Sequence, residues 1–235
     1  LSLKPTRITS MLEYETFFGF AKPEANITVT VTGTDVVATG PGTNRSPYLM
    51  YYSMQMYFAN GGGPCYIVSV GQYDTTSPTV DMNTLLTGLT AIRKEDEPTL
   101  LLFPDATSMA SDTEFYDLYD AALVQCNELQ DRFTIIDTYS DVDYDPGTGL
   151  IDPIEALRDG ITSEKDYAKY GAVYYPFLET ILDYQYKENE VAVTLTDGPS
   201  VGEEAQALMT TISSTPLQTL LTDLVTINNA IGTST

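Results

Sequence analysis

Four aspartates lie close together in the chain with a spacing that could bind a hard cation. They are Asp141, Asp143, Asp145 and Asp152. They fill positions 1, 3, 5 and 12 of a twelve-residue stretch, which is the spacing of an EF-hand calcium loop. However, Pro146 stands at the sixth position, where that loop needs glycine, and Asp152 replaces the usual bidentate glutamate. We therefore expect an acidic loop without a tight calcium site, and these aspartates remain the chain's only metal candidate.

Two glycine-rich stretches could bind phosphate through their backbone amides. Gly61–Gly63 follows a helical segment and precedes a strand, whereas phosphate-binding glycines follow a strand and precede a helix. Residues 40–46 precede a helical segment but lack the Gly-Lys-Ser/Thr of a P-loop. We interpret both stretches as turns and assign no cofactor. Asn60, Gly61, Gly62 and Gly63 are then a structural turn.

The chain contains no histidine, which excludes serine and cysteine triads that use an imidazole base. Its 33 acidic residues are so numerous that pairs will lie together by chance, and no pair stands out as acid and base. Cys65 and Cys126 form no Cys-x-x-Cys motif, so we favour two buried free thiols, although the sequence leaves a disulfide open. We predict no catalytic residue and no enzyme activity.

The formal net charge is −22, from 33 acidic and 11 basic residues. Such a surface repels nucleic acids and anionic membranes at long range and opposes self-association. No apolar run reaches the roughly 18 residues that cross a bilayer. Residues 1–5 contain no apolar signal core, so we expect neither membrane insertion nor secretion by a signal peptide.

Residues 65–175 alternate between apolar strands and amphipathic helical segments. The predicted strands are 65–70, 99–103, 133–137 and 170–175. Apolar residues between Met82 and Ile92 share one helical face, Ser111 and Glu114 read as a capping box, and Asp152 with Pro153 reads as a helix start. This alternation predicts an α/β fold with a parallel sheet flanked by helices on both faces.

The flanking regions have different patterns. Alternating β-branched residues around Gly33–Asp35 predict a β-hairpin insertion at 24–46, and residues 47–58 read as a helix buried nearly all round. Residues 180–186 and 190–196 could pair as a second hairpin, followed by helices opening near 200 and at 215. We therefore divide the chain into an α/β core at 1–178 and a hairpin with two helices at 179–235.

One segment closely resembles a known family. Residues 57–70 read Tyr-Phe-Ala-Asn-Gly-Gly-Gly-Pro-Cys-Tyr-Ile-Val-Ser-Val, which is similar to the FF-NGG-xx-CYVVRV segment of contractile tail sheath proteins. Further similar stretches follow in family order over residues 5–178. They are Pro5–Ser10, Glu13-Tyr14, Phe17–Gly19, Leu101–Asp105, Cys126–Phe133, Ile136-Asp137 and Ala172–Leu178. The family's RGVWKAPAN stretch, N-terminal arm and C-terminal domain are not recognisable, and residues 179–235 are unmatched.

The resemblance implies a subtilisin-like topology without protease activity. It implies a structural subunit that polymerises as a helical tube around an inner tube and contracts to drive it through a target envelope. The implied partners are further copies of the chain, the inner tube protein, and baseplate and tail-terminator proteins. The implied location is a virion tail, or the bacterial cytoplasm during assembly, and the host machine could be a phage, a bacteriocin or a secretion system.

Two rival functions come from other classes. The alternating strands and helices also suit a flavodoxin-like α/β ligand-binding or enzyme domain, since fold alone does not give function. A calcium-stabilised surface or adhesion module would rest on Asp141–Asp152 alone.

Overall fold

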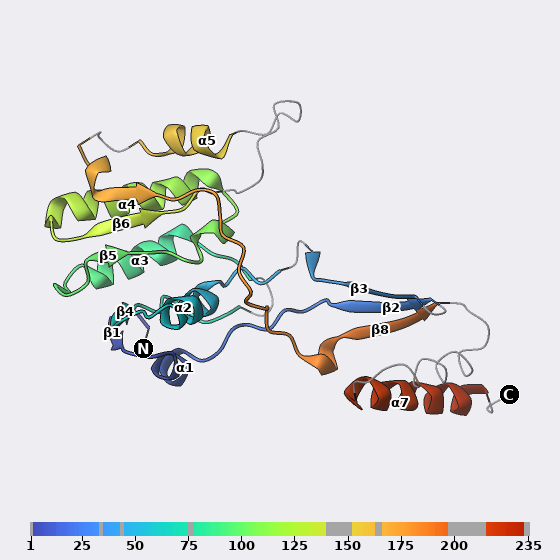
Figure 1. Cartoon of the computed structure of the whole chain (residues 1–235). Coiled ribbons are helices and arrows are strands. Elements are labelled where there is room, and N and C mark those ends of the chain that lie inside the picture. Colours follow the sequence, from blue (N-terminus) through green and yellow to red (C-terminus); the bar gives the residue numbers. More distant parts are fainter. Residues whose placement is uncertain are drawn as a thin grey trace. The chain divides into compact units, whose positions relative to one another are not determined.

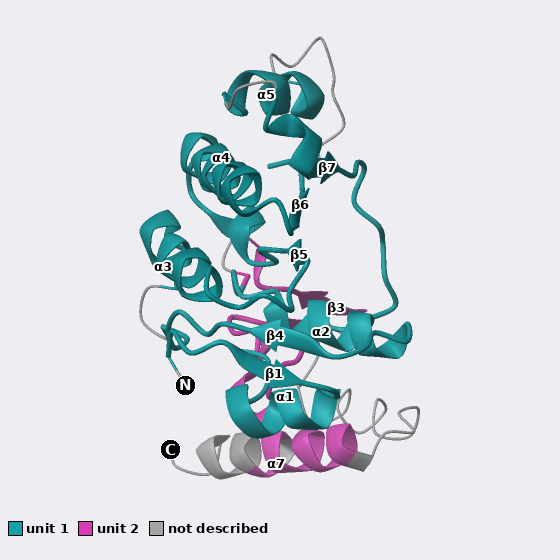
Figure 2. Cartoon of the chain, turned by 90° about the vertical axis from the view of Figure 1, so that its left-hand side faces the viewer, with its two compact units in different colours: residues 1–22, 46–183 teal, residues 23–45, 184–235 magenta. Residues whose placement is uncertain are grey.

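A computed structural model describes residues 2–32, 35–42, 45–74, 78–139, 152–162, 166–196 and 215–232. The fold is mixed α/β (Figure 1). It divides into two compact units, which Figure 2 colours separately. Unit 1 comprises residues 1–22 and 46–183, and unit 2 comprises residues 23–45 and 184–235. Within the described ranges, no helix is both long and apolar enough to cross a membrane.

The first part of unit 1 packs two helices beside a two-stranded sheet. Its elements are β1 (Thr6–Ile8), α1 (Met11–Phe18), α2 (Met50–Ala59) and β4 (Cys65–Ile67). Strands β1 and β4 pair antiparallel. Helix α1 begins where the Ser10 hydroxyl accepts a hydrogen bond from the Glu13 amide, and it ends at Gly19 with φ +86°. Both ends are set by local signals, the N-cap hydroxyl and the positive-φ glycine.

Helix α2 differs from its prediction in two ways. It begins at Met50 rather than Pro47, and only Tyr51 and Met54 are buried, while Tyr57 is exposed. Its buried side faces a core made with α1, β1 and β4. The buried members of that core are Ile8, Tyr14, Ala21, Tyr51, Met54 and Ile67.

The second part of unit 1 contains the parallel sheet. Its elements are α3 (Met82–Ile92), β5 (Leu100–Leu101), η2 (Ala106–Ser108), α4 (Asp112–Leu129), β6 (Phe133–Ile136), α5 (Pro153–Gly160), η3 (Ala168–Tyr170) and β7 (Gly171–Val173). Strands β5, β6 and β7 pair in parallel in that order. The prediction of a parallel sheet is thus confirmed for three strands. It is wrong for β4, which instead pairs antiparallel with the N-terminal strand β1.

Helices α3 and α4 pack on one face of this sheet. The Ser111 hydroxyl caps α4 as predicted, accepting from the Glu114 amide. The helix buries its apolar stripe completely against the sheet and α3. The fully buried members are Phe115, Leu118, Ala122 and Cys126. Figure 2 shows α3, α4 and α5 on the same side of β5, β6 and β7.

The opposite face of the sheet is not covered by a helix of unit 1 in the described structure. Strand register places Leu100, Leu102, Phe133, Ile135 and Ala172 on this side, which we call the bare face. Leu100 and Leu102 are exposed, and the other three are only partly buried. The prediction that helices cover both faces is thus confirmed in part: α3 and α4 cover one face, and α2 lies on the other side only at the β4 end (Figure 2). Apolarity of the strands, on which it rested, does not say where the covering surface comes from.

Unit 2 contains a three-stranded sheet and a long helix. Its elements are β2 (Thr28–Thr32), β3 (Asp35–Thr39), η4 (Glu188–Glu190), β8 (Ala192–Thr196) and α7 (Thr215–Gly232). The predicted hairpin is confirmed, because β2 and β3 pair antiparallel with Thr32 opposite Asp35. Helix α7 begins at Thr215, as predicted. The predicted helix near residue 200 lies outside the described residues.

The predicted second hairpin is wrong. Residues 187–190 form a 3₁₀ turn, Tyr186 bridges Glu24, and β8 pairs in parallel with β2. β8 alternates apolar residues with Thr, as β2 does, so Val193 and Leu195 pair with Val29 and Val31, while Thr194 and Thr196 pair with Thr30 and Thr32. The insertion therefore shares a unit with the C-terminal residues, a different grouping from the predicted segments 1–178 and 179–235.

Candidate functional site

The turn that follows α2 has the geometry that its residues suggest. The Gly62 amide donates to the Tyr57 carbonyl (2.8 Å) and the Gly61 amide to the Phe58 carbonyl (3.2 Å). Gly61 has φ +84°. These features define a Schellman motif, which satisfies carbonyls at the end of a helix that would otherwise lack partners. Asn60 adds a side-chain hydrogen bond to the Met56 carbonyl (2.8 Å).

The three glycines meet different constraints in this turn. Gly61 needs a left-handed backbone. A Cβ at Gly62 would lie 2.4 Å from the Tyr57 ring and 2.6 Å from the Tyr57 carbonyl oxygen, too close for any side chain. Gly63 has open space around it and no positive φ. The turn therefore fixes how α2 passes into β4 within a few residues, and only its first two glycines are required for that.

A partly buried carboxylate, which the sequence did not single out, starts the same helix. Asp105 follows β5 and accepts hydrogen bonds from the amides of Leu49 (2.5 Å) and Met50 (2.8 Å) at the α2 N-terminus. A negative charge there satisfies free amides and the helix dipole. Burial raises the pKa of Asp105, and the two amide hydrogen bonds partly oppose that rise. The sequence signal was a lone aspartate after an apolar strand, which has no periodicity to reveal its partner.

Tyrosines surround this carboxylate. Burial, with Asp105 nearby, raises the pKa of Tyr14, and the same two causes raise that of Tyr73 to about 12. The Tyr51 hydroxyl donates to Glu15 (2.8 Å). The phenols of Tyr14 and Tyr73 therefore stay protonated at neutral pH and pack near this carboxylate.

A second buried charge ties α3 to β6. The guanidinium of Arg132 is fully buried and donates to the carbonyls of Ile92 (3.3 Å) and Glu95 (2.9 Å). It also pairs with Asp131 (2.8 Å), and this hydrogen bond lowers the pKa of Asp131. Arg132 thus satisfies carbonyls at the C-terminal end of α3. We missed this role because its partners lie about 40 residues away along the chain.

Most of the predicted acidic loop lies outside the described residues. This holds for Asp141, Asp143 and Asp145. Asp152 is described, and its carboxylate caps α5 by accepting from the Ile154 amide (2.8 Å). The predicted start of α5 is thereby confirmed, although Ile154 is exposed rather than inside. Over the described ranges, no cluster of three or more acidic or cysteine side chains could hold a metal ion.

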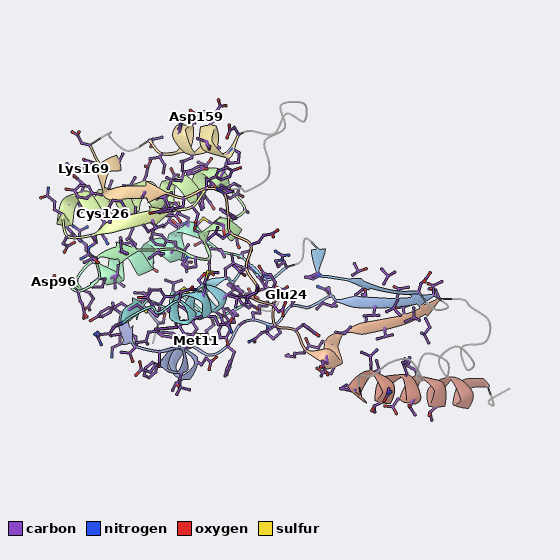
Figure 3. All side chains as sticks on the ribbon, viewed as in Figure 1. Met11, Glu24, Asp96, Cys126, Asp159 and Lys169 are labelled. Atoms are coloured by element: carbon purple, nitrogen blue, oxygen red, sulfur yellow. The ribbon has the colours of Figure 1, made fainter. Side chains whose placement is uncertain are left out.

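Both cysteines are free thiols, so the disulfide left open by the sequence is not formed. Cys126, labelled in Figure 3, is fully buried on α4, whereas Cys65 is only partly buried. Burial raises the pKa of both thiols, that of Cys126 to about 11. Each thiol is therefore protonated at neutral pH and packs as a small apolar group.

Unit 1 has a cavity of about 230 Å³ between α4, α5 and β7. Its lining is largely apolar, with Leu123, Leu157, Ile161 and Val173 beside Arg158. Open α/β sheets bind ligands where the strand order reverses. The order β5-β6-β7 simply follows the chain, so the described parallel sheet offers no such switch point.

No protein-family model matches the chain, and no curated protein matches it either. Function therefore has to be argued from the site itself. Its features are the Schellman turn between α2 and β4, the charged side chains of Asp105 and Arg132 that join elements within unit 1, and the bare face. The turn and the two charged side chains hold elements of unit 1 together, and the bare face offers an apolar surface for contact.

Proposed function

We propose that the chain is a structural subunit of a contractile tail sheath. In this role it polymerises as a helical tube around an inner tube and contracts to drive that tube through a target envelope. Its partners are further copies of itself, the inner tube protein, and baseplate and tail-terminator proteins. Its place is a virion tail, or the bacterial cytoplasm during assembly. We also propose that unit 1 follows a subtilisin-like topology, which carries no protease activity here.

The observation that carries the proposal is the segment Tyr57–Val70. Among the segments of this chain, it resembles sheath proteins most closely. Each of its conspicuous residues has a structural role, and this supports the resemblance. Gly61 supplies the positive φ, Gly62 supplies the close approach to Tyr57, and Asn60 bonds the last turn of the helix. A subunit that moves as a rigid body during contraction needs junctions of this kind.

Two further features support a mechanical role. Asp105, after β5, binds amides at the start of α2, and Arg132, just before β6, binds carbonyls at the end of α3. Both use charge-assisted hydrogen bonds. Such bonds hold elements in fixed positions when force is applied across the unit. The sequence also contains no histidine, the side chain most often used as an acid or base, and a protein without acid–base chemistry does not need one.

The experiment is negative-stain microscopy of the native particle that contains this protein, isolated with an antibody against unit 1. Tubes built from stacked rings support the proposal. A discrete globular particle, or a protein that sediments alone from the native source, overturns it. Saturable turnover of a peptide, ester or nucleotide substrate, lost on a single substitution, would also contradict it.

A further inference from the structure

The bare face is a continuous apolar surface on a strongly acidic chain. Leu100 is 55 % exposed and Leu102 57 % exposed, and Tyr174, next to β7, is 66 % exposed. Strands β5, β6 and β7 contain no charged residue. Exposed apolar surfaces of this kind mark places where another surface packs. Parallel sheets are almost always covered on both faces, and the covering element is a helix.

Helix α7 has the complementary surface. Its 18 residues would extend roughly 27 Å, enough to cross three strands. Leu217, Leu220 and Leu224 recur at i, i+3 and i+7 and therefore share one side of the helix. Leu217 and Leu220 are about half exposed, at 50 % and 47 %, whereas Leu221 on the adjoining side is buried. Part of the apolar stripe of α7 is thus exposed, as far as the described residues show.

The net charge of the chain limits which surfaces of two copies can meet. Two copies that each carry a net charge of −22 repel one another unless they meet through surfaces that lack charge. The bare face has no charged residue on its strands, and α7 has a single one, Asp223. At these two surfaces, like-charged copies can meet without placing further charges directly opposite one another. Both are apolar, so their contact would also be favoured by burial.

We propose that α7 of a second copy of this chain packs on the bare face of the β5–β6–β7 sheet. This rests on the proposed function, because a homopolymer is what supplies the second copy. The two surfaces are different, so the contact is head-to-tail and leaves one surface of each kind free at every step. Contacts of that type build open helical arrays rather than closed dimers.

The test is disulfide cross-linking between two single-cysteine additions to the whole chain. Leu102→Cys, on the bare face, is mixed with Leu220→Cys, on α7, in 1 M salt, where the Debye length is about 3 Å. The control mixture replaces Leu102→Cys with Leu12→Cys, which is 73 % exposed on α1. Mixtures of wild type with each variant show how much cross-linking the native thiols of Cys65 and Cys126 contribute. Unchanged melting temperatures show that each variant is folded.

We expect several-fold more cross-linked dimer from the Leu102/Leu220 mixture than from the Leu12/Leu220 mixture. In the chain without added cysteines, Leu220→Glu should also reduce self-association, as measured by sedimentation. Thr226→Glu, on another side of α7, should leave it unchanged. Equal cross-linking in both mixtures overturns the inference. So does a disulfide that forms only within single molecules of the Leu102→Cys/Leu220→Cys double variant.

The outcome is separable from that of the proposed function. Native tubes without this cross-link would leave the sheath assignment standing and place its contacts elsewhere. A cross-link without native tubes would leave the contact standing and remove the sheath assignment.

Discussion

Several residues of unit 1 are constrained by contacts that cannot be predicted from their neighbours in the sequence. Gly61 and Gly62 were visible as a turn, yet their two separate constraints came only from the backbone angle of one and the crowding of the other. Asp105 and Arg132 gave no local signal, because the backbone groups that they bind at the helix ends are at least 37 residues away in the sequence. The roles of such side chains become clear from the folded structure and not from the sequence pattern.

Alanine substitutions should separate the three glycines. Gly61→Ala forces a side chain into a left-handed backbone, which costs about 1 kcal/mol. Gly62→Ala adds a Cβ against the Tyr57 carbonyl, an overpacking that costs about 1–3 kcal/mol. Gly63→Ala meets open space and serves as the matched control. Thermal unfolding should rank the loss as Gly62, then Gly61, then Gly63, and a similar small loss at all three would show that the turn is not constrained in this way.

Arg132 should matter far more than a surface arginine. Arg132→Met leaves the carbonyls of Ile92 and Glu95 without their donor, and losing a buried charged partner costs about 3 kcal/mol. Arg93→Met removes an exposed ion pair with Glu128 (2.7 Å), worth about 0–1 kcal/mol. Urea denaturation of both variants measures the difference. Equal losses would mean that Arg132 does not hold the end of α3.

Asp105 gives a pH dependence of defined sign. Burial raises its folded-state pKa above the unfolded value of about 3.9, so the folded chain binds this proton more tightly. The resulting stabilisation is present below the unfolded pKa and is lost as pH rises through the folded-state pKa. Wild type should therefore lose stability relative to Asp105→Asn as pH rises from about 4, since Asn retains an acceptor oxygen for the amides of Leu49 and Met50.

Urea unfolding over a pH series tests this, with Asp81→Asn as a control of opposite sign. The Thr84 hydroxyl and amide lower the pKa of Asp81, so its stabilisation is present above the unfolded pKa and is lost as pH falls through the folded-state pKa. If the difference between wild type and Asp105→Asn is constant with pH, the carboxyl group of Asp105 is not perturbed.

At the scale of elements, the sequence predicted helices better than strand partners. The starts of α1, α4 and α5 are local, since Ser10, Ser111 and Asp152 each cap within three residues. The start of α2 was placed three residues too early because its cap, Asp105, comes from another element. Strands β4 and β8 were assigned the wrong partners for a similar reason. Periodicity shows that a strand has an apolar face, but not which edge it joins.

The candidate site divides in the same way. The Asn60–Gly63 turn was predictable, because glycine after a helical segment is a local signal. The bare face was not, because apolar strands in the sequence look the same whether a helix of their own chain covers them or not. Leu100 and Leu102 read as core residues and are exposed.

The acidic stretch yields a prediction for one element, α5. Asp152→Ala should destabilise unit 1 by about 1 kcal/mol through loss of the N-cap on the Ile154 amide. We expect this loss to be the same with and without millimolar calcium, because Pro146 occupies the position that needs glycine. Thermal unfolding with and without calcium measures both effects. Micromolar calcium binding by calorimetry that disappears in Asp143→Ala would contradict this account.

At the scale of the whole molecule, charge governs assembly. A net charge of −22 makes isolated copies repel within a Debye length of about 8 Å at physiological salt. The contacts of the proposed polymer have to overcome this repulsion, and they should strengthen as salt screens it. We expect the chain on its own to remain a monomer or small oligomer at low salt.

The most direct test of the sheath assignment is to locate this chain on native particles in both states. Gold labels attached to an exposed cysteine at position 12 would be imaged on tubes before and after contraction. The account predicts a regular axial repeat of label along the whole tube wall, with a shorter repeat in contracted tubes. Label confined to one end of the particle, or a repeat that does not change, would contradict it.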